Sequence, residues 1–363
     1  MPFFSCTEEN WPENAPDSQT DNDDVEFSLE FASRSAEDGL DDIKKYFKDE
    51  KTTLWISQRF SSGDNSLDFT PDSKNLYEYY YNGNTTADWE QGYNFSPSNP
   101  DHKLTWNEIE KNPYGNTFAF GAMFFPGGVV PEYEVPEDQT NEDVFVKTDI
   151  MGAYHKTSEK RSRLRFRLYH LMTNLKVTLV VPEWDAETNT GFFEGAVKSA
   201  RVLNRTLNYT IDWGQRSTEE PPVLNAQEKT GDITMYRYFS DANVPELKKN
   251  YNLSGFGIPD LTTDNVRLYT FEAMFPPQHI SSGNKLISFS IERAGIDLTY
   301  NFSTSTGTTT GDIDLGAGSR MDLFLYLPRD AKELIFLSAE ITDWKGSNSE
   351  FTITEDNNRP AND

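Results

Sequence analysis

Cysteine and histidine are scarce in this chain of 363 residues, which holds one cysteine and four histidines. A single cysteine cannot form an internal disulfide, so packing and hydrogen bonds must hold the fold together. His102, His155, His170 and His279 show neither the HxH nor the HExxH spacing of zinc sites, so no metal site is expected. His170 falls on an apolar face, and we expect it to be a core histidine bonded to a backbone carbonyl.

Long apolar runs are also missing. No stretch reaches the roughly 18 apolar residues of a transmembrane helix. The sequence begins MPFFSCTEEN, and polar residues then continue to residue 24. This order is similar to the end of a bacterial lipoprotein signal, in which the cysteine is lipidated and a polar tether follows. We therefore expect a lipid at Cys6, with residues 1–24 as signal remnant and flexible tether. The alternative is an unstructured N-terminus with an incidental cysteine.

Basic charge is in short supply, because 33 lysines and arginines face 59 acidic residues and leave a net charge of −26. Phosphate backbones and anionic lipids repel such a chain, so nucleic acid is not an expected partner. The acidic runs DNDD (21–24) and DID (312–314) lack the ligand spacing of an EF-hand. We expect both to be solvated loops.

Catalytic motifs are missing as well. The sequence contains no GxSxG, P-loop or dinucleotide fingerprint, and GAGSR (316–320) precedes a strand where a phosphate loop would precede a helix. A glycosidase needs two carboxylates, but the many acidic residues identify no particular pair. We expect no catalytic residue and no cofactor.

Aromatic residues are abundant, with 25 Phe and 17 Tyr, and short alternating runs indicate strands. In residues 25–31 (VEFSLEF), one face carries Val25, Phe27, Leu29 and Phe31. Further strands are expected over residues 52–60, 76–81, 116–128, 143–153, 233–239, 266–275, 285–293, 296–302, 321–327 and 333–344. A short helix is expected near residues 41–47, and a tight turn at residues 294–295.

The stretch RLRFRLYHLMTNLKVTLVVP (163–182) alternates arginines with apolar residues. The apolar parity changes between His170 and Leu175, which predicts a bulge or a sheet-crossing bend within residues 171–174. A helix is the competing interpretation, and the valine-rich second half favours strands. The arginines, among them Arg165 and Arg167, are expected to pair with carboxylates on neighbouring strands. The tyrosine run 77–81 is a candidate sugar-stacking patch, although strand packing explains it equally well.

Two domains are expected from the length of the chain. An echo between FGAMFFP (120–126) and FEAMFPP (271–277) indicates similar construction in both halves. We expect an N-terminal domain over residues 25–185 and a C-terminal domain with a polar tail over residues 186–363, with the boundary between 183 and 215.

Taken in order, these segments resemble the Bacteroidales fimbrillin-like family, the lipoprotein pilins of type V pili. The matching segments are VEFSLEFASRSA, LTWNEI, FAFGAMFFP, TDIMGA, the stretch RFRLYHLMTNLKVTLVVP, and ITDW near the end. Glu8 and Glu9 after the cysteine are similar to the surface-export tag of Bacteroidetes lipoproteins. The resemblance implies two tandem transthyretin-like Greek-key β-sandwiches on the outer membrane surface.

The resemblance also implies an assembly route, donor-strand exchange. A trypsin-like protease would cut after Arg34 and release the first strand, whose apolar residues are Val25, Phe27, Leu29 and Phe31. A neighbouring subunit would then fill the opened groove.

The donor segment implied for this chain is the C-terminal one, where Phe351 and Ile353 alternate with threonines. The implied partners are other pilin subunits and a host or bacterial surface receptor, and the membrane is reached only through the lipid. Two alternatives stay open: a surface lipoprotein that binds glycans without polymerising, and a glycoside hydrolase.

Overall fold

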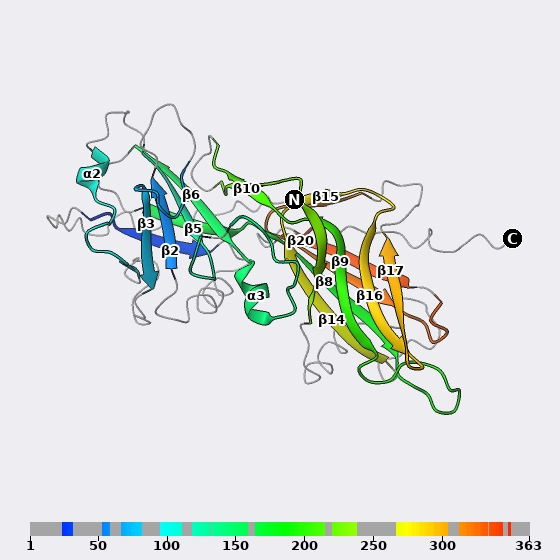
Figure 1. The fold of residues 1–363 in the computed structure, drawn as a ribbon. Coiled ribbons are helices and arrows are strands. Elements are labelled where there is room, and N and C mark those ends of the chain that lie inside the picture. Colours follow the sequence, from blue (N-terminus) through cyan, green and yellow to red (C-terminus); the bar gives the residue numbers. More distant parts are fainter. Residues whose placement is uncertain are drawn as a thin grey trace, which may run out of the picture.

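The computed structural model describes residues 24–31, 53–58, 67–81, 95–110, 118–130, 132–158, 164–214, 220–237, 266–303, 312–332, 334–343 and 348–349. The prediction of an all-β fold is confirmed, because strands dominate these residues. Figure 1 shows two groups of strands side by side, with the blue and cyan strands in one group and most green to orange strands in the other.

The first seven strands form one sheet in the order β1-β7-β6-β5-β2-β3-β4. Their bounds are Phe27–Phe31 (β1), Thr53–Gln58 (β2), Leu76–Tyr81 (β3), Phe95–Pro97 (β4), Phe118–Phe124 (β5), Met151–Thr157 (β6) and Leu164–His170 (β7). Every neighbouring pair is antiparallel except β1 with β7, which is parallel. β1 and β4 are therefore the two edges of this sheet.

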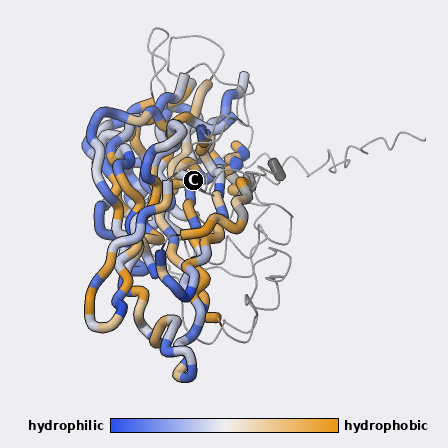
Figure 2. The backbone as a smooth tube through the Cα atoms, turned by 90° about the vertical axis from the view of Figure 1, so that its right-hand side faces the viewer, coloured by the Kyte–Doolittle hydropathy of each residue, from blue (hydrophilic) through white to orange (hydrophobic). Residues whose placement is uncertain are grey.

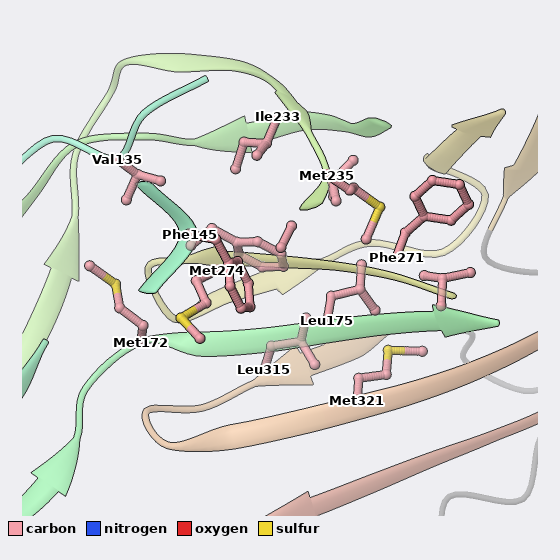
Figure 3. Packing of buried hydrophobic residues seen from close by; sticks show 14 of the residues in the cluster. Val135, Phe145, Met172, Leu175, Ile233, Met235, Phe271, Met274, Leu315 and Met321 are labelled. Carbon is pink, nitrogen blue, oxygen red and sulfur yellow. The ribbon is translucent and has the colours of Figure 1, made fainter. Parts of the chain in front are cut away.

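The later strands form a six-stranded sheet, β13-β14-β8-β19-β20-β21, a four-stranded sheet, β12-β9-β16-β17, and two short ribbons, β10-β11 and β15-β18. The bounds are Thr173–Pro182 (β8), Val197–Thr206 (β9), Tyr209–Asp212 (β10), Val223–Ala226 (β11), Thr230–Thr234 (β12), Tyr236–Arg237 (β13), Val266–Phe275 (β14), Gln278–Ile280 (β15), Lys285–Arg293 (β16), Ile296–Ser303 (β17), Ile313–Leu315 (β18), Ser319–Tyr326 (β19), Ile335–Asp343 (β20) and Asn348–Ser349 (β21). Figure 3 shows part of the apolar core of these strands, where Leu175, Phe271 and Met321 gather with Val135 and Phe145 from earlier in the chain.

The stretch 163–182 forms two strands in two different sheets. β7 ends at His170 in the seven-stranded sheet, and β8 begins at Thr173 in the six-stranded sheet. The predicted sheet-crossing bend is therefore confirmed, and the competing helix is wrong. Leu171 and Met172 are fully buried at the crossing.

β8 belongs to a sheet of the second half of the chain. β8 pairs with β14 and β19, and the predicted boundary after residue 185 stays a prediction. The chain changes sheets between His170 and Thr173, before the predicted range. The sequence pattern does not show at which residue the chain changes sheets, because apolar strands lie on both sides of the crossing.

The expected strand over residues 143–153 is also corrected. α3 occupies Glu142–Lys147, and β6 begins only at Met151. Asn141 caps α3, because its side chain accepts a hydrogen bond from the backbone N–H of Asp143 at 2.8 Å. Two acidic residues in the first turn and a lysine in the last complement the helix dipole. A second short helix, α2 (Trp106–Glu110), follows Leu104.

Two apolar cores lie on opposite faces of the seven-stranded sheet. In β5, Phe118 and Phe120 belong to one core, whereas Ala119 and Met123 belong to the core shared with the second half. Figure 2 shows orange apolar and blue polar segments following one another along the strands. Trp213 joins the shared core and stacks on Phe69, with ring centroids 5.0 Å apart.

Several predicted details hold. β3, β14 and β16 match their predicted residues, and the tight turn lies at Ala294 and Gly295, both with positive φ. The helix expected near 41–47 lies outside the described residues. Where the structure describes the chain, no helix is long and apolar enough to cross a membrane.

Candidate functional site

The site begins with the position of β1 at an edge of the seven-stranded sheet. Among the strands that the structure describes, β1 pairs only with β7, in parallel register, with Phe27 opposite Leu164 and Phe31 opposite Leu168. The backbone N–H of Leu164 donates to the carbonyl of Glu26 at 3.0 Å. A parallel pair is slightly less stable per residue than an antiparallel one, so a single parallel ladder holds β1 relatively weakly.

The apolar face of β1 is nevertheless deeply buried. Val25, Phe27 and Leu29 are each only 5% exposed and belong to one core cluster. Burying side chains of this size contributes about 1.5–3 kcal/mol each relative to exposure. The predicted common face is thus confirmed for Val25, Phe27 and Leu29, while the side chain of Phe31, the fourth predicted member, is not among those described.

Aromatic rings surround Phe27. Its ring meets Tyr79 of β3 edge to face at 4.9 Å and lies 6.1 Å from Phe166 of β7. Phe95 of β4 lies 5.9 Å away. Strands from both ends of the sheet order therefore meet at this ring, so the sheet curls over β1, and loss of Phe27 would leave an aromatic-lined groove.

A clasp fixes the start of β1. The backbone N–H of Val25 donates to the carbonyl of Leu104 at 3.1 Å, and Lys103 Nζ lies 2.6 Å from the carboxylate of Asp24. About a third of each charged side chain is exposed, so the ion pair contributes little, about 0–1 kcal/mol. The clasp therefore depends mainly on the backbone bond.

Tyr79 holds Leu104, the partner of Val25 in this clasp. Its hydroxyl accepts a hydrogen bond from the backbone N–H of Leu104 at 3.1 Å. Burial raises the pKa of the Tyr79 phenol far above its usual value, because the site cannot solvate a phenolate. The hydroxyl stays neutral and available as an acceptor, and it orients the segment that grips β1.

The arginines of β7 lie on the other face of the strand. Arg165 is exposed and Arg167 is half-buried, while Leu164, Phe166 and Leu168 are buried. The register places Glu30 of β1 opposite Arg167. The expected pairing of the arginines with carboxylates on neighbouring strands stays a prediction.

His170 differs from its predicted partner. Its Nδ1 lies 2.9 Å from a carboxylate oxygen of the fully buried Asp149, whereas a backbone carbonyl was expected. The reason is local: β6 starts just after Asp149, and Met151 faces His170 in the ladder. His155 adopts the predicted arrangement instead, with Nδ1 3.0 Å from the carbonyl of Arg165.

The remaining predicted residues fall in two groups. Cys6, Arg34, Phe351 and Ile353 lie outside the described residues, so lipidation, processing and the donor segment stay predictions. In the tyrosine run, Tyr77 and Tyr79 are buried and Tyr80 is 37% exposed.

The acidic candidates are engaged in local contacts. Asp24 pairs with Lys103, and His279 Nδ1 lies 2.6 Å from Asp314, with Asp312 3.7 Å from its other ring nitrogen. Among the described residues, no group of histidine, cysteine and carboxylate side chains could hold a metal ion.

The sequence interpretation missed the residues that grip β1. Phe95, Lys103 and Leu104 come from a segment without alternation, so no periodic signal identified them. In the sequence, the LTWNEI segment contributes to the family resemblance only through its order in the chain. Its start supplies the carbonyl that fixes Val25.

Comparison with known proteins adds the family. The model of the family described as fimbrillin-like matches residues 49–344. No curated protein matches the sequence.

The chain is also similar to several solved structures. A proposed cell adhesion protein from Bacteroides uniformis has 11% identity and a TM-score of 0.46, with 88% of this chain and 97% of that chain covered. A proposed cell adhesion protein from Bacteroides ovatus has 11% identity and a TM-score of 0.45, with the same coverage of 88% and 97%.

The tip fimbrial protein Mfa3 from Porphyromonas gingivalis has 10% identity and a TM-score of 0.37, with 88% of this chain and 99% of that chain covered. Since the family model matches well over half of the residues, this chain belongs to the fimbrillin-like family.

Proposed function

We propose that this protein is a structural subunit of a type V pilus on the outer membrane surface, with a role in adhesion. In this proposal the chain is exported as a lipoprotein through Cys6. A protease then cuts after Arg34, β1 leaves, and a segment of a neighbouring subunit takes its place. Membership in the fimbrillin-like family supports the fimbrial role.

One observation carries the assembly step: within the described part of the chain, β1 is an edge strand with a single partner, yet its apolar face is almost fully buried. Loss of such a strand leaves unpaired backbone groups along β7 and an apolar groove beneath them. An extended segment from another chain would satisfy both at once. A five-residue edge can be replaced without breaking any other ladder of the sheet.

The first test treats the full chain with a trypsin-like protease. We expect cleavage after Arg34, release of the N-terminal fragment, and filaments visible by electron microscopy. Arg34→Ala should stay intact at this position and monomeric, whereas Arg163→Ala is the control and should still polymerise. Filaments formed equally well by Arg34→Ala would contradict the proposal.

A second test locks β1 in place. Ser28 and Arg165 are register partners of β1 and β7, so the pair Ser28→Cys and Arg165→Cys should form a disulfide across them. Once cut, the oxidised variant should stay monomeric and should polymerise after a reductant is added. Ala119→Cys with Lys156→Cys, register partners in β5 and β6, is the matched control and should polymerise when oxidised.

A further inference from the structure

The connection between β8 and β9 carries an exposed aromatic pair that the assembly step does not use. Phe193 is 57% exposed, and its ring stacks on the half-buried Trp184 with centroids 4.4 Å apart and an interplanar angle of 21°. Figure 1 shows this green connection projecting past the end of β17, away from β1. Aromatic side chains with one accessible face are enriched where proteins bind ligands and partners.

The connection is rigid. Trp184 N–H donates to the carbonyl of Phe192 at 2.9 Å, and Asp185 N–H donates to the carbonyl of Thr190 at 2.8 Å. Gly191 has a φ of 100°, and a Cβ there would lie 2.2 Å from the carbonyl oxygen of Glu183. The two aromatic rings are therefore preorganised, which reduces the conformational entropy that is lost when a ligand binds.

The polar groups beside the aromatic pair have hydrogen-bonding capacity that their contacts with one another leave unused. Glu183 and Glu194 are adjacent in sequence to the two aromatic residues, and they lie 3.9 and 3.7 Å from the guanidinium of Arg267. These distances are too long for direct hydrogen bonds. Hydroxyl groups of a ligand could use these donors and acceptors.

Charge and size narrow the ligand. Residues 183–195 contain four carboxylates, while Arg267, Arg293 and Arg329 lie against this connection, so the site keeps a small excess of negative charge and offers an anionic ligand no net attraction. Two rings expose far less than the roughly 1,000 Å² that a stable protein interface buries. A sugar ring fits this site, since its C–H face stacks on an aromatic face and its hydroxyl edge meets carboxylates and guanidinium.

We infer that Trp184 and Phe193 form a binding site for a neutral saccharide. The inference rests on the adhesive part of the proposed function and not on strand exchange. The uncut monomeric chain therefore tests it, and failed polymerisation has no bearing on the result.

The test is affinity electrophoresis of the uncut chain in gels that contain mannan, dextran or xylan, with polygalacturonate as an acidic comparison. We expect at least one neutral polysaccharide to retard the protein and polygalacturonate not to. Trp184→Ala and Phe193→Ala should each weaken this binding at least about ten-fold. Ile296→Ala, a matched control at another exposed apolar residue, should bind as the unaltered chain does.

Four results of the gel assay would overturn the inference: no retardation in any neutral gel, stronger retardation by polygalacturonate, unchanged binding by Phe193→Ala, or equal loss in Ile296→Ala. Phe193 is mostly exposed, so its removal should leave the melting temperature unchanged, which separates lost binding from unfolding. Sedimentation of the same samples gives a further check. A dimer that Phe193→Ala dissociates would assign the pair to self-association and would also overturn the inference.

Discussion

β1 and β8 are both apolar strands, but they are held in very different ways. β8 has ten residues, all buried except the half-buried Lys176, and pairs with β14 on one side and β19 on the other. β1 has five residues and, of the described strands, pairs only with β7. Burial alone does not decide which strand can leave. The deciding factor is the number of strand pairings that are lost when a strand leaves, and the departure of β1 breaks only its pairing with β7.

The sharpest way to break this comparison is to place a charge in each strand. Leu179→Asp in β8 should lose more than about 4 kcal/mol and its cooperative unfolding, because an unpaired charge would sit between two sheets. Leu29→Asp in β1 should release the strand and leave the remaining fold cooperative. Urea unfolding followed by circular dichroism measures both. Equal damage from the two substitutions would show that β1 is as integral as β8.

A smaller effect is expected at the clasp of β1. Tyr79→Phe removes the acceptor of the buried Leu104 N–H and should cost about 1–3 kcal/mol. Proteolysis within residues 24–31 should also become faster, since Leu104 fixes Val25. Tyr80→Phe, at the exposed neighbour, is the control and should change the free energy of unfolding by less than about 0.5 kcal/mol.

The ion pair of the clasp should matter less. Lys103→Ala should lower stability by about 0.2–1 kcal/mol, because both Lys103 and Asp24 keep about a third of their side chains in water. Adding salt should weaken the ion pair in the unaltered chain and so reduce the difference in the free energy of unfolding between that chain and Lys103→Ala. A stability loss in Lys103→Ala that grows with salt concentration would contradict this account.

The smallest effect is expected at a third short element, the β15-β18 ribbon. The hydrogen bond to Asp314 raises the pKa of His279 above its usual value of 6.5. The protonated form is thus favoured in the fold, so its contribution is fully present below a pH of about 6.5 and is lost as pH rises through the folded pKa.

Asp314→Asn should lower the pKa of His279 toward about 6.5, as measured by NMR titration of the ring. Asp330→Asn, at a distant turn, is the control and should leave that pKa unchanged. An unaltered pKa of His279 in Asp314→Asn would refute the assignment of its cause.

Strand periodicity anticipated much of the fold. The residues of β3, β14 and β16 and the shared face of Val25, Phe27 and Leu29 followed from alternation alone. Prediction failed where local polar contacts competed with the pattern. Asn141 caps a helix within an expected strand, and Asp149 replaces the expected carbonyl partner of His170.

The candidate site was only partly accessible from the sequence. Alternation identified β1, but it could not show that β1 pairs in parallel with β7, nor that Leu104 and Tyr79 grip its start. Those contacts join residues far apart in the chain, and a periodic pattern carries no information on distant partners. The stack of Trp184 on Phe193 was missed for the same reason, because a turn brings the two rings together.

The sequence by itself determined that this protein is built from strands and which face of each main strand is apolar. The reason is that a pleated strand turns successive side chains to opposite sides, so burial leaves a period of two in the chain. Only the tertiary structure decided that β1 is an edge and β8 is central, since edge and centre differ in their neighbours and not in their own residues.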